Sequence, residues 1–535
     1  MPPFQARILV LSLIFLSLTA MGQGSKIEIV NANALLGGNA LPNGAKRLIG
    51  NVQFKHEGAK LYCDSSWYYP NENRLEAFGN VRIKQGDTLD LRGKYLEYSG
   101  QSKKALVTGG VRFRDKSMTL ETDRLDYDRK NQHAYYQNGG VIVDEDNRLR
   151  SERGSYFSRS KQFFFADSVV LVNPKYTIFS DTLLYNTRSK RADFAGETRI
   201  ESDSNLILCR RGFYNTKTNL SAFFKGASLI QGEQRLNADS LFYDRNRNYG
   251  EAYRKVTVHD TLEGISLYGD FGKYFGNDKD SRIFGERAYL AIQTEDDSLF
   301  MHADSLHFYE DSSFKSFDAF PKVRFYQSDF QGLADTVYWS ERDSLMHFIE
   351  DPIVWADGQQ LTADTMFALI DQGKISWLKM VSSAILISKD TLNDFNQIQG
   401  GEMKAYFKDN TLNRILVEGN AQSVFFARED DGSFIGLDLA KSSRMTLWFK
   451  NSDLDRIVYG KDVNAQLKPS NSIEASDRRL QNFEWRIWLK PNQKSDIFIQ
   501  PINPISKELE TQPKDLDPNK EQKDLNRDEI LDKED

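Results

Sequence analysis

A repeated word of about 30 residues constrains this chain more than any other feature of its sequence. The clearest copy reads LNADSLFYD from Leu236 and continues, after a polar turn, as EAYRKVTV from Glu251. The residues that align with Asp239 of this copy are Asp64, Gly93, Asp123, Arg153, Asp181, Arg210, Asp270, Asp304, Asp335 and Asp364. A chain of such units is expected to fold as a stack of repeats, since each unit is too small to bury a core alone.

Each repeat holds two runs in which apolar and polar residues alternate, the pattern of a half-buried strand. Polar turns such as DRKNQ at 128–132 and DRNRN at 244–248 separate the runs. A glycine precedes the last apolar pair, as at Gly79, Gly109 and Gly196, and favours a bulge or bend there. Stacked repeats therefore predict an elongated, all-β, two-sheet structure in which each repeat adds one strand spacing of ~4.8 Å.

The N-terminus has the features of an export signal. Arg7 supplies a positive charge, residues 8–20 are mostly apolar, and Ala20-Met21-Gly22 is a small-residue cleavage site. A membrane anchor is the alternative, but the apolar run is shorter than the ~20 residues that span a bilayer. We expect a cleaved signal peptide at 1–22, regular repeats at 45–370, divergent repeats with a C-terminal cap at 371–500, and a disordered acidic tail at 501–535.

Charge and motifs argue against several functions. The chain has 70 Lys and Arg against 76 Asp and Glu, so its net charge of −6 disfavours nucleic acid as the main partner. It has no nucleophile elbow, zinc-protease helix, phosphate-binding loop or dinucleotide fingerprint, which predicts a protein that is not an enzyme and carries no cofactor. The abundant carboxylates leave a β-solenoid polysaccharide-active enzyme as one alternative. An exported structural or adhesive repeat protein is another.

Two groups of residues suggest metal binding at first sight. The recurrent Asp could ligate calcium, but the Gly-rich turns of calcium-binding β-rolls are missing, so a turn or an outward strand position is expected instead. His302 and His307 flank Asp304 at an odd spacing, which on one strand would place them on opposite faces. We therefore expect no metal site.

The repeated x-A-D-x-(L/V/M)-x-(Y/F) word, its Gly-Asn-Val partner and the export signal resemble the OstA-like domain of the LptA family, over roughly residues 45–467. The resemblance implies an open β-jellyroll whose sheets diverge in a V, with lipid A acyl chains between them. It also implies a periplasmic lipopolysaccharide-binding protein that carries its cargo from the inner to the outer membrane along an apolar groove. The partners implied are an inner-membrane export complex, an outer-membrane insertion barrel and further copies arranged head to tail.

The candidate lipid-binding residues are large apolar side chains at two places in the repeat. One place lies three residues before the aligned Asp. The other is the alternating apolar pair that follows the glycine, or the position that takes the place of the glycine in other repeats. Stacked in register, these positions form apolar ladders that either pack as core or cover acyl chains. The candidates are Leu120, Val141, Val143, Leu236, Val256, Val258, Met301, Val323, Phe325 and Leu361.

Overall fold

The computed structural model describes residues 25–501, apart from 39–40, 42–43, 87–88, 116–117, 145, 294–296, 311–314, 372–373, 391–393, 409–410, 430 and 451–452. The expected signal peptide and nearly all of the expected acidic tail lie outside the described residues. The chain divides into two compact units, residues 1–203 and 204–535. The division falls inside the region expected to hold the regular repeats.

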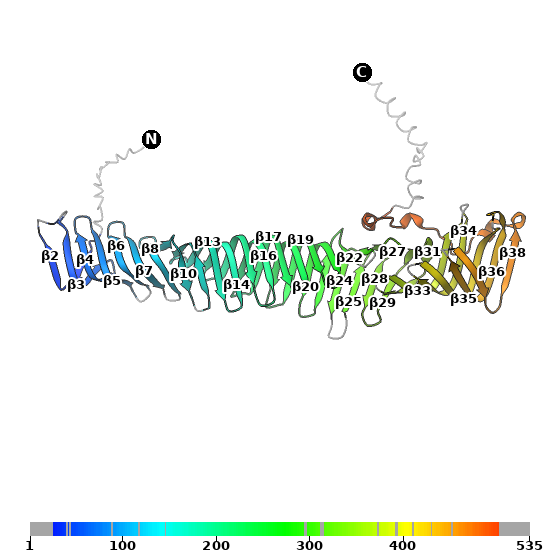
Figure 1. The fold of residues 1–535 in the computed structure, drawn as a ribbon, viewed down its shortest axis with the longest axis horizontal. Helices are drawn as coiled ribbons and strands as arrows, with labels where there is room; N and C mark the ends of the chain where they lie inside the picture. The colour runs from blue at the N-terminus through cyan, green and yellow to red at the C-terminus, as the bar shows by residue number, and fades with distance from the viewer. Residues whose placement is uncertain are drawn as a thin grey trace, which may run out of the picture. The chain divides into compact units, whose positions relative to one another are not determined.

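Unit 1 consists of antiparallel strands (Figure 1). From β3 to β8 each strand pairs with the next one in sequence. Between β8 and β13 the two sheets run separately, with the pairings β8-β9-β12-β13 and β8-β10-β11-β13. The alternation of buried and exposed side chains along β4 and β5 matches the period of 2 read from the sequence. Its strands are β1 (Glu28–Asn31), β2 (Ala34–Gly37), β3 (Lys46–His56), β4 (Ala59–Tyr69), β5 (Arg74–Gln85), β6 (Leu89–Ser99), β7 (Lys104–Asp115), β8 (Met118–Asp128), β9 (His133–Tyr136), β10 (Gly140–Val143), β11 (Arg148–Ser151), β12 (Arg153–Phe157), β13 (Gln162–Asn173), β14 (Tyr176–Asn186) and β15 (Arg191–Glu201).

The long strands bend at their midpoints, and in strands such as β5 and β15 the bend lies at the glycine that the sequence marks. In β5, Gly79 and Asn80 both have positive φ, and the register with β6 shifts between Phe78 and Val81. Asn80 Nδ2 donates a 2.9 Å hydrogen bond to the carboxylate of Asp64 on the neighbouring strand. The bend divides each strand between two sheets: sheet A contains residues 74–78 of β5 and the halves paired with them, and sheet B contains residues 81–85 and their partners.

This arrangement corrects the expected advance per repeat. Both strands of a repeat bend, so both contribute to both sheets, and they lie side by side in each ladder. One repeat therefore adds two strand spacings, about 9.6 Å, in place of one. The predicted fold class, an all-β jellyroll built from two-strand repeats, is confirmed.

Unit 2 follows the same plan, and its sheets A and B contain residues 249–253 and 256–260 of β19, respectively. From β21 to β32 the strands are shorter and the two sheets run as separate ladders, β20-β21-β24-β25-β28-β29-β32-β33 in sheet A and β20-β22-β23-β26-β27-β30-β31-β33 in sheet B. Strands β33 to β36 again bend through both sheets.

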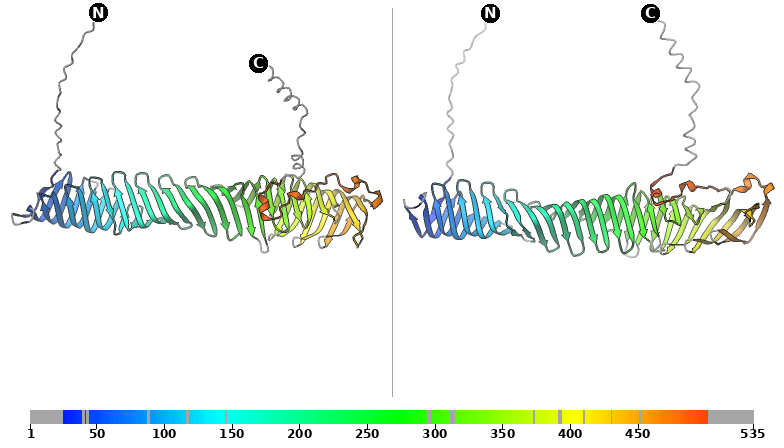
Figure 2. Two further views of the ribbon diagram at one scale, coloured as in Figure 1. Left: turned by 90° about the horizontal axis from the view of Figure 1, so that it is seen from above. Right: turned by 45° about the horizontal axis from the view of Figure 1, so that its top comes forward.

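The strands of unit 2, seen again in Figure 2, are listed here in chain order. They are β16 (Leu206–Asn215), β17 (Leu220–Gln231), β18 (Gln234–Asp244), β19 (Tyr249–Asp260), β20 (Ile265–Phe275), β21 (Asp280–Phe284), β22 (Tyr289–Gln293), β23 (Ser298–His302), β24 (Ser305–Glu310), β25 (Lys315–Phe320), β26 (Val323–Tyr326), β27 (Phe330–Ala334), β28 (Thr336–Ser340), β29 (Leu345–Ile349), β30 (Ile353–Ala356), β31 (Gln359–Thr362), β32 (Thr365–Asp371), β33 (Lys374–Lys389), β34 (Phe395–Lys408), β35 (Thr411–Arg428), β36 (Phe434–Lys450), β37 (Asp453–Tyr459) and β38 (Asn464–Pro469).

Residues 470–500, which we call the C-terminal strap, contain the 3-10 turns η2 (Ser470–Ser472), η3 (Ala475–Arg478), η4 (Ile487–Leu489) and η5 (Lys494–Phe498). The strap packs on the outer face of sheet B, where it covers polar residues that would otherwise face water. The side chain of Gln360 donates to Glu484 O at 2.7 Å and accepts from Arg486 N at 2.8 Å. Gln397 makes the same pair of bonds to Arg478 O and Leu480 N.

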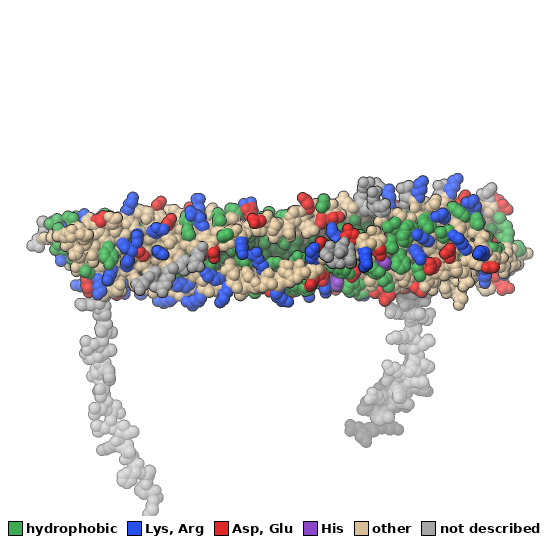
Figure 3. Space-filling view, turned by 90° about the horizontal axis from the view of Figure 1, so that it is seen from below, with side chains coloured by type: hydrophobic (Ala, Val, Ile, Leu, Met, Phe, Trp, Pro, Cys, Tyr) green, Lys and Arg blue, Asp and Glu red, His purple; other side chains and the backbone are tan. Residues whose placement is uncertain are grey.

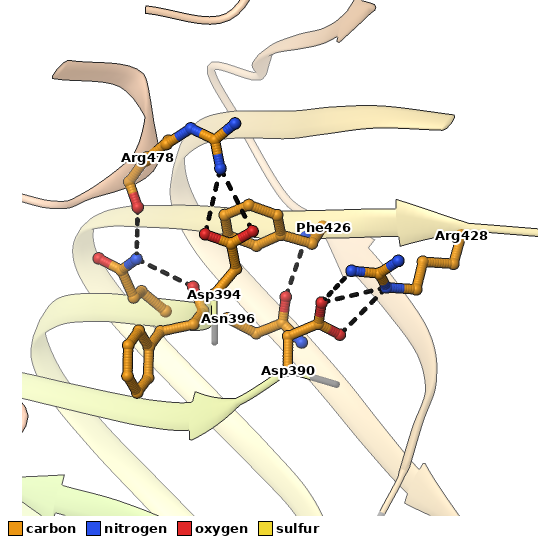
Figure 4. A network of polar contacts seen from close by, with 8 residues as sticks. Asp390, Asp394, Asn396, Phe426, Arg428 and Arg478 are labelled. Carbon is orange, nitrogen blue, oxygen red and sulfur yellow. Dashed lines mark hydrogen bonds and ion pairs between the residues drawn. The ribbon is translucent and has the colours of Figure 1, made fainter. Parts of the chain in front are cut away.

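Ion pairs hold the strap and its neighbouring turn in place. Arg478 contacts both carboxylate oxygens of Asp394, at 3.1 and 3.2 Å, while Arg428 forms a bidentate pair with Asp390 (Figure 4). The strap explains why the polar outer face of β31, with Gln360, is buried as well as its inner face.

Candidate functional site

A continuous apolar row runs along the inner face of sheet B in unit 2. Each member is the register partner of the next: Ile207, Leu229, Leu236, Val258, Leu267, Leu290, Met301, Phe325, Gly332, Val354, Leu361, Leu386 and Ile398. Five candidates from the sequence, Leu236, Val258, Met301, Phe325 and Leu361, fall in this single row. Stacking of the repeats therefore brings together residues far apart in the chain.

The side chains of this row change from half-buried to fully buried along its length. Met301, Phe325 and Leu361 are each 0% exposed and belong to one large core. Leu236 and Val258, like Ile207 and Leu229, are only half-buried. We call the inner face of β16 to β19 the open stretch. Figure 3 shows a recess lined by hydrophobic side chains over these strands.

The candidates that directly follow a bend are core residues. Val256 follows Lys255 and Val323 follows Lys322, and both of these lysines have positive φ. Each valine is 1% exposed. These two positions therefore support the two sheets where they meet and do not line accessible space.

The opposite wall of the open stretch, on sheet A, carries small residues among large ones. Its inner row is Gly212, Phe223, Leu241, Ala252 and Gly272. The next inner row, toward the strand ends, is Tyr214, Ser221, Tyr243, Gly250 and Tyr274. Gly, Ala and Ser thus stand among bulky residues in both rows of this wall.

In unit 1 the corresponding row of sheet B is Phe54, Leu61, Ile83, Leu91, Phe113, Leu120, Ile142, Leu149, Leu171, Ile178 and Ile200. Leu120 lies in it, 1% exposed. Val141 and Val143 do not, and their expected inward orientation is wrong. Val143 is 40% exposed, while Ile142 between them is buried.

The cause of this error is a shift of one residue at the bend. Gly140 pairs with Thr122, as Val111 does on the preceding strand, so glycine takes the inward position expected for a valine. The ring of Tyr136 fills the space above it, since a Cβ on Gly140 would come within 2.6 Å of Tyr136 Cζ. A shift of one residue turns every following side chain to the other face.

Tyrosines form a row near the ends of the sheet A strands, a feature that we did not predict from the sequence. In unit 1 the row is Tyr68, Tyr98, Tyr127, Tyr156 and Tyr185, with one residue of the intervening strand between each pair. Tyr214, Tyr243 and Tyr274 occupy the equivalent place in unit 2. The same spacing of about 30 residues that revealed the repeats also relates these tyrosines.

In unit 1, tyrosines of this row on sheet A form hydrogen bonds with residues of sheet B. We call the edge opposite the bends, where hairpin turns of the two sheets face each other, the mouth. The hydroxyl of Tyr98 on sheet A lies 2.7 Å from His56 Nδ1 on sheet B, and Arg129 donates to the same hydroxyl at 2.7 Å. Burial raises the pKa of Tyr98 above its ordinary value, which keeps the phenol neutral.

A second connection across the mouth of unit 1 involves a buried carboxylate. The hydroxyl of Tyr156 on sheet A donates to Asp115 Oδ2 on sheet B at 2.5 Å. Lys161 Nζ lies 2.9 Å from the same oxygen. Burial, followed by the hydrogen bond to Asp115, raises the pKa of Tyr156. These connections fasten the two sheets of unit 1 to each other at the mouth.

In the open stretch the tyrosines bond within their own sheet. Tyr243 donates to Asn248 at 2.8 Å, and Tyr214 lies 3.5 Å from Asn219. Neither of these hydrogen bonds crosses the mouth. At the end of this stretch Lys315 of sheet A approaches Glu263 of sheet B, with 3.6 Å between Nζ and Oε1.

The two histidines considered as metal ligands do not lie together. His302 and His307 lie on different sheets, on β23 and β24, and not on one strand as the sequence suggested. His302 Nδ1 lies 2.6 Å from Ala288 O. In the part of the chain that the structure describes, no group of three or more His, Cys, Asp and Glu is arranged to hold a metal ion. No described helix is long and apolar enough to cross a membrane.

The fold and this groove define a class: a repeat protein of the β-jellyroll type with an apolar inner face that opens to the surface over part of its length. The OstA-like protein family model matches residues 24–181. The resemblance predicted from the repeated words is thereby confirmed, over a shorter stretch than the expected 45–467.

One solved structure similar to this chain is LptH of Pseudomonas aeruginosa, described as the LptA-homologous periplasmic component of the lipopolysaccharide transport device. The two are 14% identical, the match covers 26% of this chain and 99% of that one, and the TM-score is 0.21. No protein with a curated function matches this chain.

Proposed function

We propose that this protein is a periplasmic carrier that binds lipopolysaccharide, or a related glycolipid, by its acyl chains and passes it along the groove from the inner toward the outer membrane. The observation that supports this most directly is the half-buried row of Ile207, Leu229, Leu236 and Val258 in the open stretch. The match of residues 24–181 to the OstA-like family agrees with it.

The physical basis of binding is burial of apolar surface. Each methylene of an acyl chain that leaves water for this groove contributes roughly 0.8 kcal/mol. The surface for these chains is the half-buried row of sheet B, with Leu236 and Val258. No covalent step is needed, and the protein acts as a carrier and not as an enzyme.

Transport in one direction needs an energy source and two docking partners. The sequence has no nucleotide-binding motif, so the work is assigned to an ATP-driven inner-membrane export complex. An outer-membrane insertion barrel would receive the cargo. The edge strands β2 of unit 1 and β38 of unit 2 pair on one side in the described residues, and such edges accept a strand from another chain or another copy.

Photo-crosslinking in cells tests the groove. A benzophenone amino acid at Leu236 or Val258 is expected to capture glycolipid, detected by immunoblot and mass spectrometry of the adduct. The matched control is Phe242, which lies on the outer face of the same strand as Leu236 and is 39% exposed. Equal labelling at Leu236 and Phe242, or turnover of polysaccharide by the purified protein without lipid capture, would overturn the proposal in favour of an adhesive or enzymatic role.

A further inference from the structure

The two rims of the open stretch differ in charge. The sheet A turn between β16 and β17 carries Lys217, and the turn between β18 and β19 carries Arg245 and Arg247. The opposing sheet B turns carry Glu233 and Glu263. All five side chains are exposed. The mouth therefore has one basic side and one acidic side.

Asp244, an acidic residue beside the basic rim, forms its hydrogen bonds with the backbone of its own turn. Asp244 Oδ1 accepts the backbone N–H groups of Asn246 at 3.0 Å and Arg247 at 3.3 Å. Its carboxylate thus caps the turn, and the two arginines beside it extend from a preorganised loop. Arg247 lies over the ring of Tyr249, with its guanidinium carbon 5.3 Å from the ring centre.

Three cations at the equivalent turns of unit 1 bond to groups of the protein itself. Lys103 Nζ lies 2.8 Å from Glu57, Arg129 bonds Tyr98, and Lys161 bonds Asp115. In the described residues no ion pair involves Lys217, Arg245 or Arg247. The open stretch therefore combines an accessible apolar interior with rim cations that remain available to a ligand.

Polarity on sheet A rises in steps from the interior to the rim. Along β18, the inward positions are Leu241, which is buried, and Tyr243, which is half-buried, and Arg245 follows in the turn. Tyr274, in the same row as Tyr243, is 43% exposed. A sequence of apolar, phenolic and cationic groups matches an amphiphile with acyl chains, a polar linker and an anionic head group.

Resting on the proposed function, we infer that the sheet A rim of the open stretch binds the phosphate groups of the cargo. The cargo then enters with its head group over Lys217, Arg245 and Arg247 and its acyl chains directed toward the sheet B row. The acidic sheet B rim disfavours the reverse orientation, because like charges repel. The preferred ligand is accordingly a phosphorylated glycolipid and not a neutral lipid of the same acyl composition.

The test compares lipid A with enzymatically dephosphorylated lipid A that has the same acyl chains, each bound to the purified full-length chain. The rim variant Lys217→Gln/Arg245→Gln/Arg247→Gln is expected to bind lipid A on the order of tenfold more weakly at low salt. Its binding of the dephosphorylated form should be unchanged. The Glu233→Gln/Glu263→Gln variant should bind lipid A more tightly.

A control variant with the same charge change isolates the rim. Lys225, Arg254 and Lys255 lie at the bends of β17 and β19, at the opposite edge of the same strands, and all three are exposed. Changing them to Gln should leave both affinities unaltered. If the rim variant binds lipid A as the wild type does, or loses both lipids equally, the inference fails while the carrier function stands. If the wild type binds neither lipid, the proposed function itself fails.

Discussion

The carboxylate of Asp181 lies over Gly196 on the neighbouring strand and accepts a 3.1 Å hydrogen bond from the backbone N–H of Glu197. Gly196 has φ of 88°, and a Cβ there would overlap Asp181 Oδ2. The recurrent Asp and the recurrent Gly of the repeat therefore meet at the bend that divides each strand between the two sheets.

Replacement of Gly196 by alanine should destabilise unit 1 by about 2–3 kcal/mol, since left-handed strain adds to the overlap with Asp181. The measurement is urea denaturation followed by circular dichroism. Gly110→Ala is the matched control: φ there is 65°, but no atom lies within 4 Å of the added Cβ, so about 1 kcal/mol is expected. Equal losses in the two variants would show that the Asp–Gly contact is unimportant.

Loss of the Tyr156 hydroxyl should weaken the connection across the mouth of unit 1. Tyr156→Phe removes a 2.5 Å hydrogen bond from the buried Asp115 carboxylate, at a cost of about 1–3 kcal/mol. Hydrogen exchange should also accelerate at the ends of β7 and β12. The comparison is Tyr243→Phe, whose hydroxyl bonds Asn248 on its own sheet at a more accessible position and should matter by less than about 1 kcal/mol. Similar effects in both variants would contradict the role of the cross-mouth bond.

Acid should weaken unit 2 through His302. Burial lowers the pKa of His302 below its ordinary value of about 6.5. As the pH falls below about 6.5, the unfolded chain takes up a proton that the folded chain does not, so stability declines until the folded-state pKa is passed. His302→Gln should flatten the dependence of the unfolding free energy on pH between about 7 and 5.

Burial also lowers the pKa of His307, so its contribution has the same sign. The double variant with His307→Gln should therefore give the flattest profile. A slope identical to that of the wild type in both variants would exclude these histidines as the source of the acid sensitivity.

Replacement of two outer-face glutamines should release the C-terminal strap. Gln360→Leu and Gln397→Leu each remove two hydrogen bonds to strap backbone, at about 1–3 kcal/mol per site. Limited trypsin digestion, read by mass spectrometry, should show faster cleavage after Arg479 and Arg486. Gln234→Leu, which removes an exposed hydrogen bond to Asp260, is the control. Unchanged cleavage rates would mean that ion pairs alone hold the strap.

The inward row could be predicted in those repeats that keep the fixed spacing between the apolar residue and the aligned Asp. Leu120, Leu236 and Leu361 were identified because they stand at a fixed distance from the aligned Asp, and the stacked register places each in an apolar row. Val141 and Val143 could not be placed correctly by the same rule. Their orientation depends on the ring of Tyr136, which fills the position that a valine occupies in other repeats.

A C-terminal cap was expected, but the place where the strap packs lay beyond prediction, because its contacts join residues distant in sequence. Arg324 donates to Leu489 O at 2.8 Å across a separation of 165 residues, and burial lowers the pKa of Arg324 to about 10. Alternation along β26 indicated only that Arg324 points outward. What covers an outward side chain is decided by a segment whose own sequence shows no strand pattern.

The sequence by itself determined the repeat, the two strands within it, the bend at its glycine and the inward face of those strands that keep the regular spacing from the aligned Asp. These properties depend on neighbours two to four residues apart, whose alternation and backbone preferences act locally. Only the tertiary structure decided where the groove is accessible. Whether an inward side chain is core or groove wall depends on side chains of the opposite sheet and on bonds across the mouth. Such bonds, like that of Tyr156 to Asp115, form only when successive repeats have stacked.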